Sequence, residues 1–140
     1  MEKLSIEEKI AISNFRFEKA KETLKDSIIA FKNSSFKMSS NRSYYAVLHA
    51  IRSLLILKGL DPVTHDGAKT MFSLYFIKTK LLPSETLKFF NHLLLLRRDV
   101  DYGDFEEIEA EDAKNALDMA KRFIKMVNSV RLKLISEIKD

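Results

Sequence analysis

The sequence predicts an all-α protein, and two observations support that prediction. Only 3 glycines and 2 prolines interrupt its 140 residues, so the chain has few turn signals. Apolar residues recur at helical spacing along almost the whole chain. With 46% apolar and 31% charged residues, the composition is that of a globular protein. At this length we expect a single domain over residues 1–140.

The first helix has the clearest start signal. Ser5 and Glu8 are spaced as a capping box, in which each side chain accepts a hydrogen bond from the other residue's backbone N–H. The polar segment NSSFKMSSN follows the helical pattern and ends it. We therefore expect a helix from about Ile6 to Lys32. Its apolar face would be formed by Ile10, Phe17, Leu24, Ile28 and Phe31.

The second helix is predicted between a serine-rich start and a glycine. Ser39, Ser40 or Asn41 can provide the side-chain oxygen that caps its first turn. Gly59 is suited to end it, because glycine adopts the left-handed conformation common after a helix C-terminus.

The remaining chain predicts three further helices. The third starts near His65 and stops before the Leu-Pro pair at 82–83. The fourth opens at Ser84 and runs through the leucines at 93–96 to about Asp99 or beyond. The last begins in an acidic stretch and continues to about Ile138. The chain is thus expected to form about five helices.

The charge distribution is uneven. The net charge is +4, yet the segment from Asp99 to Asp112 holds 8 acidic residues and no basic one. The other 12 acidic residues face 24 basic ones, so the rest of the chain is strongly positive. The segment is either an acidic helix start, which the helix dipole favours, or a negative patch beside Arg97 and Arg98.

Several site classes lack support in the sequence. There is no cysteine, so disulfides and thiolate metal sites are excluded. His49, His65 and His92 come from three different predicted helices without ligand spacing, so we expect no metal and no cofactor. The charged start lacks the pattern of a signal peptide, and no apolar run approaches the roughly 18 residues of a membrane span. We therefore expect a cytoplasmic protein without a membrane partner.

A polar line is predicted along the second helix. Arg42, Tyr45, His49 and Arg52 recur at i, i+3, i+7 and i+10, which places them within a stripe of about 80°. An apolar stripe adjoins it, so the polar line borders the core. These side chains are either amphipathic residues with solvated tips or the lining of a binding groove.

The segment LLLLRRDVDYGDF suggests a second group of polar residues. If the fourth helix continues through it, Arg98 and Tyr102 lie at i and i+4 on one face, and Arg97 pairs with Asp101 on the next. Arginine's planar group suits phosphate, and a neighbouring phenol can donate a hydrogen bond or a proton. We take Arg97, Arg98 and Tyr102 as candidate catalytic residues.

Three segments together resemble a known family. NRSYYAVLHAIRSLLILKGL, THDGAKTMFSLYFIKTKLLP and LRRDVDYGDF, in this order, are similar to the HEPN family of small α-helical proteins, and to its subgroup with an Arg-x-x-x-Asp-Tyr motif. The resemblance implies an up-and-down helical bundle that forms a homodimer. It also implies a metal-independent ribonuclease, the toxin of a toxin–antitoxin pair whose partner is a minimal nucleotidyltransferase.

The family motif is an arginine followed, after four to six residues, by a histidine. In this chain Arg97 matches the arginine and Tyr102 stands where the histidine is expected; alternatively, Arg98 with Asp99 matches the arginine and its polar neighbour. A histidine with a pKa of ~6.5 exchanges protons near neutral pH, whereas a tyrosine at ~10 is ionised about one part in a thousand. Tyr102 is also a candidate for nucleotide modification by the partner enzyme. The alternative function is a non-catalytic dimeric module that binds a nucleotide or a protein.

Overall fold

The computed structural model describes residues 3–102 and 108–140, with side chains omitted for 98–102. It is 84% helical, and its described residues contain no strand, which confirms the predicted all-α class. The helices follow one another as α1 (Ile6–Lys32), α2 (Phe36–Leu55), α3 (His65–Phe72), α4 (Ser84–Tyr102) and α5 (Ala110–Lys139). Two short segments join them, the 3₁₀ turn η1 (Ile56–Lys58) and the π-helical turn η2 (Ser73–Ile77).

Helix α1 has the predicted bounds because its capping box forms. The Glu8 backbone N–H donates to Ser5 Oγ at 3.0 Å, and the Ser5 N–H donates to Glu8 Oε1 at 2.9 Å. These two bonds satisfy N–H groups that have no partner inside the helix. The helix ends at a tight turn over 33–35, where Ser34 has a φ of 58°.

Helix α2 begins earlier than predicted. Ser35 is its N-cap residue, so the prediction of Ser39, Ser40 or Asn41 at that position was wrong. Ser39 and Ser40 are buried within the helix instead. Ser27 Oγ of α1 donates to the Ser39 carbonyl at 2.7 Å, so Ser39 packs the two helices together. Ser39, which the sequence pattern favours as a helix N-cap, is therefore a small residue in the interface between α1 and α2.

The ends of α2 and α3 follow ordinary capping rules. After η1, Gly59 takes a φ of 76°, the left-handed conformation predicted for it. Thr64 caps α3, since its hydroxyl accepts from the Gly67 N–H at 2.9 Å. The third predicted helix continues beyond Phe72 as the π turn η2, and Phe72 and Phe76 both lie in the core with stacked rings.

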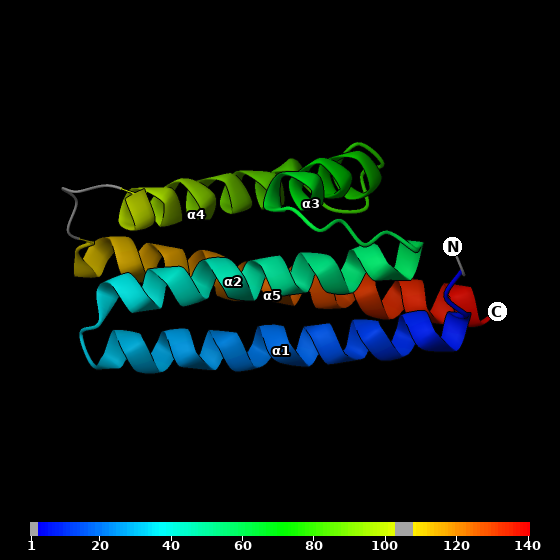
Figure 1. The fold of residues 1–140 in the computed structure, drawn as a ribbon, viewed down its shortest axis with the longest axis horizontal. Helices are drawn as coiled ribbons and strands as arrows, with labels where there is room; N and C mark the ends of the chain where they lie inside the picture. Colours follow the sequence, from blue (N-terminus) through cyan, green and yellow to red (C-terminus); the bar gives the residue numbers. More distant parts are fainter. Residues whose placement is uncertain (1–2, 103–107) are drawn as a thin grey trace.

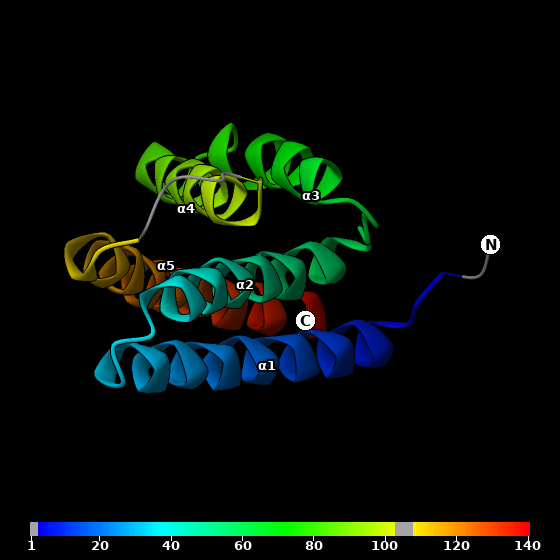
Figure 2. The same cartoon turned by 60° about the vertical axis from the view of Figure 1, so that its left-hand side comes forward.

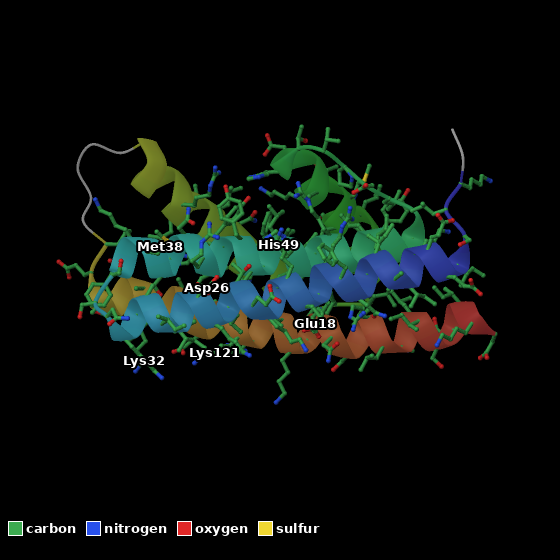
Figure 3. The ribbon with its side chains drawn as sticks, turned by 60° about the horizontal axis from the view of Figure 1, so that its bottom comes forward. Glu18, Asp26, Lys32, Met38, His49 and Lys121 are labelled. Atoms are coloured by element: carbon green, nitrogen blue, oxygen red, sulfur yellow. The ribbon has the colours of Figure 1, made fainter. Side chains whose placement is uncertain are left out.

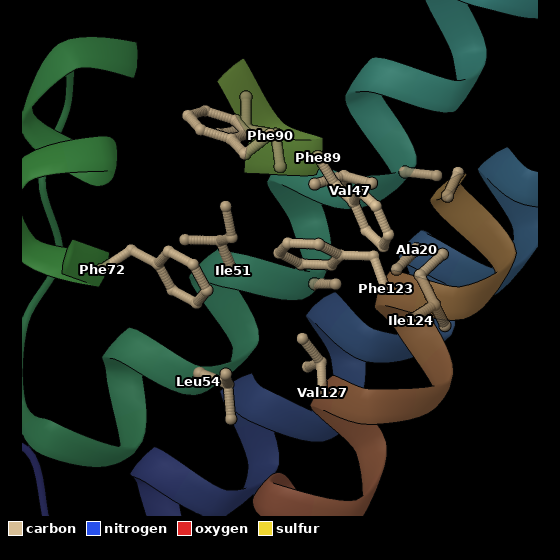
Figure 4. Close-up of a cluster of buried hydrophobic side chains, with 14 of the residues drawn as sticks. Ala20, Val47, Ile51, Leu54, Phe72, Phe89, Phe90, Phe123, Ile124 and Val127 are labelled. Carbon is tan, nitrogen blue, oxygen red and sulfur yellow. The ribbon is translucent and has the colours of Figure 1, made fainter. Parts of the chain in front are cut away.

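The helices pack in an ordered bundle (Figures 1 and 2). In both views α2 and α5 lie between α1 on one side and α3 with α4 on the other. Figure 4 shows the core where these elements meet, with Val47 and Ile51 of α2 beside Phe72, Phe90 and Phe123. Helix α2 contacts every other α-helix, so its residues border both halves of the bundle. No helix in the described parts of the chain is both long enough and apolar enough to span a membrane.

Candidate functional site

Helix α2 carries the predicted polar line, which we call the α2 stripe: Arg42, Tyr45, His49 and Arg52. All four residues are half-buried, so each has a packed stem and a solvent-accessible part. The two halves of the stripe have different neighbours. Tyr45 contacts Arg97 of α4 and His65 of α3, and Arg42 lies over the Tyr45 ring, whereas His49 and Arg52 lie beside α1 and the loop at 61–63.

Arg97 of α4 lies over aromatic rings of α2. Its guanidinium carbon is 5.3 Å from the centre of the Tyr44 ring and 5.5 Å from that of Tyr45. Arg42 approaches the Tyr45 ring at 5.2 Å. All three distances are typical of cation–π contacts, which hold a guanidinium in place without neutralising its charge. Arg97, one of the two candidate motif arginines, and the α2 stripe therefore meet at Tyr45.

His65, the first residue of α3, belongs to the same group of side chains. Its Nδ1 is hydrogen-bonded to Tyr44 Oη at 2.8 Å. The His65 ring centre lies 5.6 Å from that of Tyr44 and 5.9 Å from that of Tyr45. Arg97 and His65 therefore lie against the same two tyrosines, and we call the group of Tyr44, Tyr45, His65 and Arg97 the tyrosine–histidine centre.

The tyrosine–histidine centre is rigidly supported. Tyr44 is fully buried, and its ring stacks on Phe90 of α4 at 5.7 Å. The hydrogen bond between the buried phenol and Nδ1 holds the imidazole in one orientation, and the hydroxyl can serve as donor or acceptor according to the tautomer. The sequence pattern does not indicate this arrangement, because Tyr44 follows the apolar spacing of α2 and His65 shows no ligand spacing with the other histidines. The two residues are 21 positions apart, and no local spacing links them.

The other half of the α2 stripe lines a hollow of about 350 Å³ between α1 and α2. Figure 3 shows His49 on α2 where these two helices run side by side. Burial and the positive charges of Lys19, Arg52, Arg42 and Arg16 lower the pKa of His49 from 6.5 to about 4. His49 is therefore neutral at physiological pH.

The structure extends α4 through Tyr102, so Arg98 and Tyr102 are one helical turn apart along the backbone. The side chains of Arg98 and Tyr102, and the acidic residues at 103–107, lie outside the described residues. The structure therefore leaves their roles as predictions. The residues whose side chains are described include no cluster of three or more histidine, aspartate and glutamate side chains able to hold a metal ion.

Comparison with known proteins decides the family. The model of the HEPN domain family matches residues 13–130, which include α2, α3, α4 and most of α1 and α5. The chain belongs to the HEPN domain family.

Several relatives of this HEPN protein cover most of its length. It is 33% identical to a UPF0332 protein of Thermotoga maritima over 132 residues, which are 94% of this chain and 97% of the relative. Two proteins of Methanocaldococcus jannaschii are each 30% identical to it and bear the name "Putative toxin". The matches span 86% and 75% of this chain, and 80% and 78% of those relatives.

Proposed function

We propose that this HEPN protein is the toxin of a toxin–antitoxin pair and cleaves RNA without a metal ion at the tyrosine–histidine centre. The observation that carries the proposal is the hydrogen bond between Tyr44 and His65 beside Arg97. It provides a histidine near the motif arginine, although the motif itself has tyrosine at the histidine position. The names of the two Methanocaldococcus jannaschii relatives support the toxin assignment.

The reaction is attack of an RNA 2′-hydroxyl on the neighbouring phosphorus. In our proposal His65 takes the hydroxyl proton, the 2′ oxygen bonds to phosphorus, and the bond to the 5′ oxygen breaks. Tyr102 gives a proton to that leaving oxygen, while Arg97 stabilises the negative charge that develops on the phosphate. The products are a 2′,3′-cyclic phosphate and a free 5′-hydroxyl.

Cleavage of a labelled RNA in the presence of EDTA tests this function. His65→Gln should abolish cleavage, because glutamine cannot exchange a proton near neutral pH. His92→Gln is the matched control, since His92 is an exposed histidine of α4. A metal requirement, or undiminished cleavage by His65→Gln, contradicts the proposal. Binding of RNA without cleavage by the unaltered protein would instead favour the non-catalytic module.

We also propose that the protein is a homodimer in which two copies of α4 approach each other. Leu95, two residues before Arg97, is 60% exposed on α4, which is a large apolar side chain to leave in water. A two-fold dimer would bring two copies of the candidate residues to one interface. Light scattering at micromolar concentration should give twice the monomer mass, and a monomer there would count against this arrangement.

The proposed partner is a minimal nucleotidyltransferase that modifies Tyr102. The tyrosine oxygen would attack the α-phosphorus of ATP, lose its proton and displace pyrophosphate. The added phosphate would bring negative charge beside Asp101 and repel RNA. Co-expression with such a transferase, followed by intact-mass measurement, should show one added nucleoside monophosphate. An unchanged mass, or an adduct that persists in Tyr102→Phe, excludes this site.

A further inference from the structure

The half of the α2 stripe that the proposed cleavage does not use forms a basic pocket, defined by Arg16, Lys19, His49 and Arg52. Its residues come from α1 and α2, and the loop at 61–63 closes one side. Arg16 is 23% exposed and fixed from two directions. It donates to the Arg52 carbonyl at 3.4 Å and pairs with Asp61 at 3.1 Å. The pocket is therefore held together by contacts between separate elements.

The charges of the basic pocket are not balanced. Arg16, Lys19 and Arg52 contribute three positive charges, and among the described residues Asp61 is the one acidic residue that lines the hollow. The buried Nε of Arg52 has no hydrogen-bond partner among the described residues. A buried donor without a partner costs roughly 1–3 kcal/mol, so an acceptor bound there would be stabilised.

His49 reports the same excess of positive charge. Burial is the largest cause of the lowered His49 pKa, and the positive charges of Lys19 and Arg16 of α1 and of Arg52 and Arg42 of α2 lower it further. Asp61, which lines the hollow, is paired with Arg16. The neutral imidazole can donate one hydrogen bond and accept another. A pocket of this kind suits an anion with several oxygen atoms.

The rim of the basic pocket is apolar and exposed. Phe15 of α1 is 68% exposed and Val63 of the loop is 92% exposed, and both line the hollow. An exposed phenylalanine beside arginines is the arrangement on which a nucleobase stacks when its phosphate is held by the cations. The rim therefore favours a nucleic-acid phosphate over a bare inorganic anion.

We propose that the basic pocket binds a phosphate group of the RNA chain, one or a few nucleotides away from the bond that is cleaved at the tyrosine–histidine centre. Tyr45 and Arg52 belong to one stripe of α2, and seven helical residues span about 10 Å. A short run of nucleotides covers that distance along the helix. The choice of RNA as the ligand rests on the proposed RNA cleavage. The proposal that the pocket binds a phosphate group does not depend on that cleavage.

Imidazole NMR of the full-length protein tests the phosphate chemistry by itself. The His49 signal is assigned with His49→Gln, and its pH titration is followed with and without inorganic phosphate, adenosine monophosphate and a non-cleavable 2′-deoxy oligonucleotide. A bound phosphate should raise the pKa of His49, because its negative charge opposes the four cations. An unchanged His49 titration with all three ligands overturns the proposal.

Fluorescence anisotropy with a fluorescently labelled form of the same 2′-deoxy oligonucleotide tests whether the ligand of the basic pocket is a nucleic-acid chain. Arg52→Gln and Lys19→Gln should each weaken binding about tenfold and reduce the slope of log affinity against log salt by about 0.7. Lys125→Gln, which removes an exposed lysine of α5, is the control for net charge and should change affinity little. Equal affinities in all three variants overturn the RNA assignment, and a His49 response to the mononucleotide would then identify a free nucleotide as the ligand. If His65→Gln loses cleavage but keeps its affinity for the oligonucleotide, the basic pocket binds independently of the chemistry at the tyrosine–histidine centre.

Discussion

The two sides of α2 use polar residues in opposite ways. Towards α1, the serine side has small hydroxyls that are fully buried and hydrogen-bonded: Ser13, Ser27, Ser39, Ser43 and Ser53. Towards α3 and α4, the tyrosine–histidine centre has large rings and a guanidinium, and His65, Tyr45 and Arg97 are half-buried. The serine contacts with α1 thus complete their hydrogen bonds inside the protein, while the tyrosine–histidine centre keeps polar atoms near solvent.

This difference suggests that the serine side of α2 stabilises the fold, whereas the tyrosine–histidine centre is suited to bind a ligand. Small side chains let two helix backbones approach closely, and Ser27 bonds to both the carbonyl and the hydroxyl of Ser39. Buried and satisfied groups of this kind fix the geometry of a pair of helices. Rings and cations that remain partly exposed can instead exchange water for a ligand. Substitutions on the serine side should therefore change stability, and substitutions at the tyrosine–histidine centre should change activity.

Arg97→Ala is expected to have the largest effect. Loss of a group that stabilises transition-state charge should lower the cleavage rate about 100- to 1,000-fold, equivalent to ~3–4 kcal/mol. The fold should lose far less, since the cation–π contacts contribute about 1 kcal/mol at a half-buried position. Single-turnover cleavage and urea unfolding measure the two quantities. Arg97→Lys keeps the charge but not the planar group and should recover part of the rate. A purely structural Arg97 would change both measurements in proportion.

Ser27→Leu should give the largest loss of stability. The longer side chain overpacks the contact between α1 and α2 and removes hydrogen bonds to Ser39 and Ser43, at a combined cost of about 3 kcal/mol. Urea unfolding measures this cost, and Ser129→Leu, at an exposed position of α5, is the control. The rate of cleavage per folded molecule should stay close to normal. A large change in that rate would show that the two sides of α2 are not independent.

His49 should make the stability depend on pH. Its pKa is about 4 in the folded protein, against 6.5 as its ordinary value, so the unfolded chain binds the proton more readily. Stability should fall as the pH falls from about 6.5 to about 4, by roughly 1–2 kcal/mol after allowance for partial exposure. Urea midpoints across this range measure the effect. The His49→Gln variant should lose this part of the pH dependence, and an identical profile would contradict the expectation.

Tyr44→Phe should have the smallest effect, and it tests most directly whether the tyrosine–histidine centre serves activity more than stability. It keeps the buried ring and removes the hydroxyl that bonds to His65, so unfolding should cost about 1 kcal/mol less. Without that bond the imidazole loses its fixed orientation, and cleavage should fall about tenfold with a shifted pH profile. Tyr75→Phe, at an exposed tyrosine, is the control. An unchanged pH profile would assign Tyr44 a packing role alone.

Local sequence signals predicted the fold well and the site in part. The capping box of Ser5 and Glu8 and the left-handed turn at Gly59 depend only on residues close in sequence. The sequence pattern alone therefore locates these helix ends. The start of α2 was missed because the serines that favour a cap are used for packing against Ser27. His65 was missed for a similar reason, since its contact with Tyr44 depends on how α3 folds back over α2. The motif located Arg97 but could not show which rings it contacts.

The turn at 33–35 has a consequence for the order in which the protein folds. It joins α1 directly to α2, so among the described residues the most extensive helix–helix contact forms between two consecutive helices. Local contacts pay little loop-closure entropy, and we expect this helical hairpin to form early in folding. The tyrosine–histidine centre needs α2, α3 and α4 together and would form later. A nascent chain would then acquire a stable scaffold before it acquires a reactive centre.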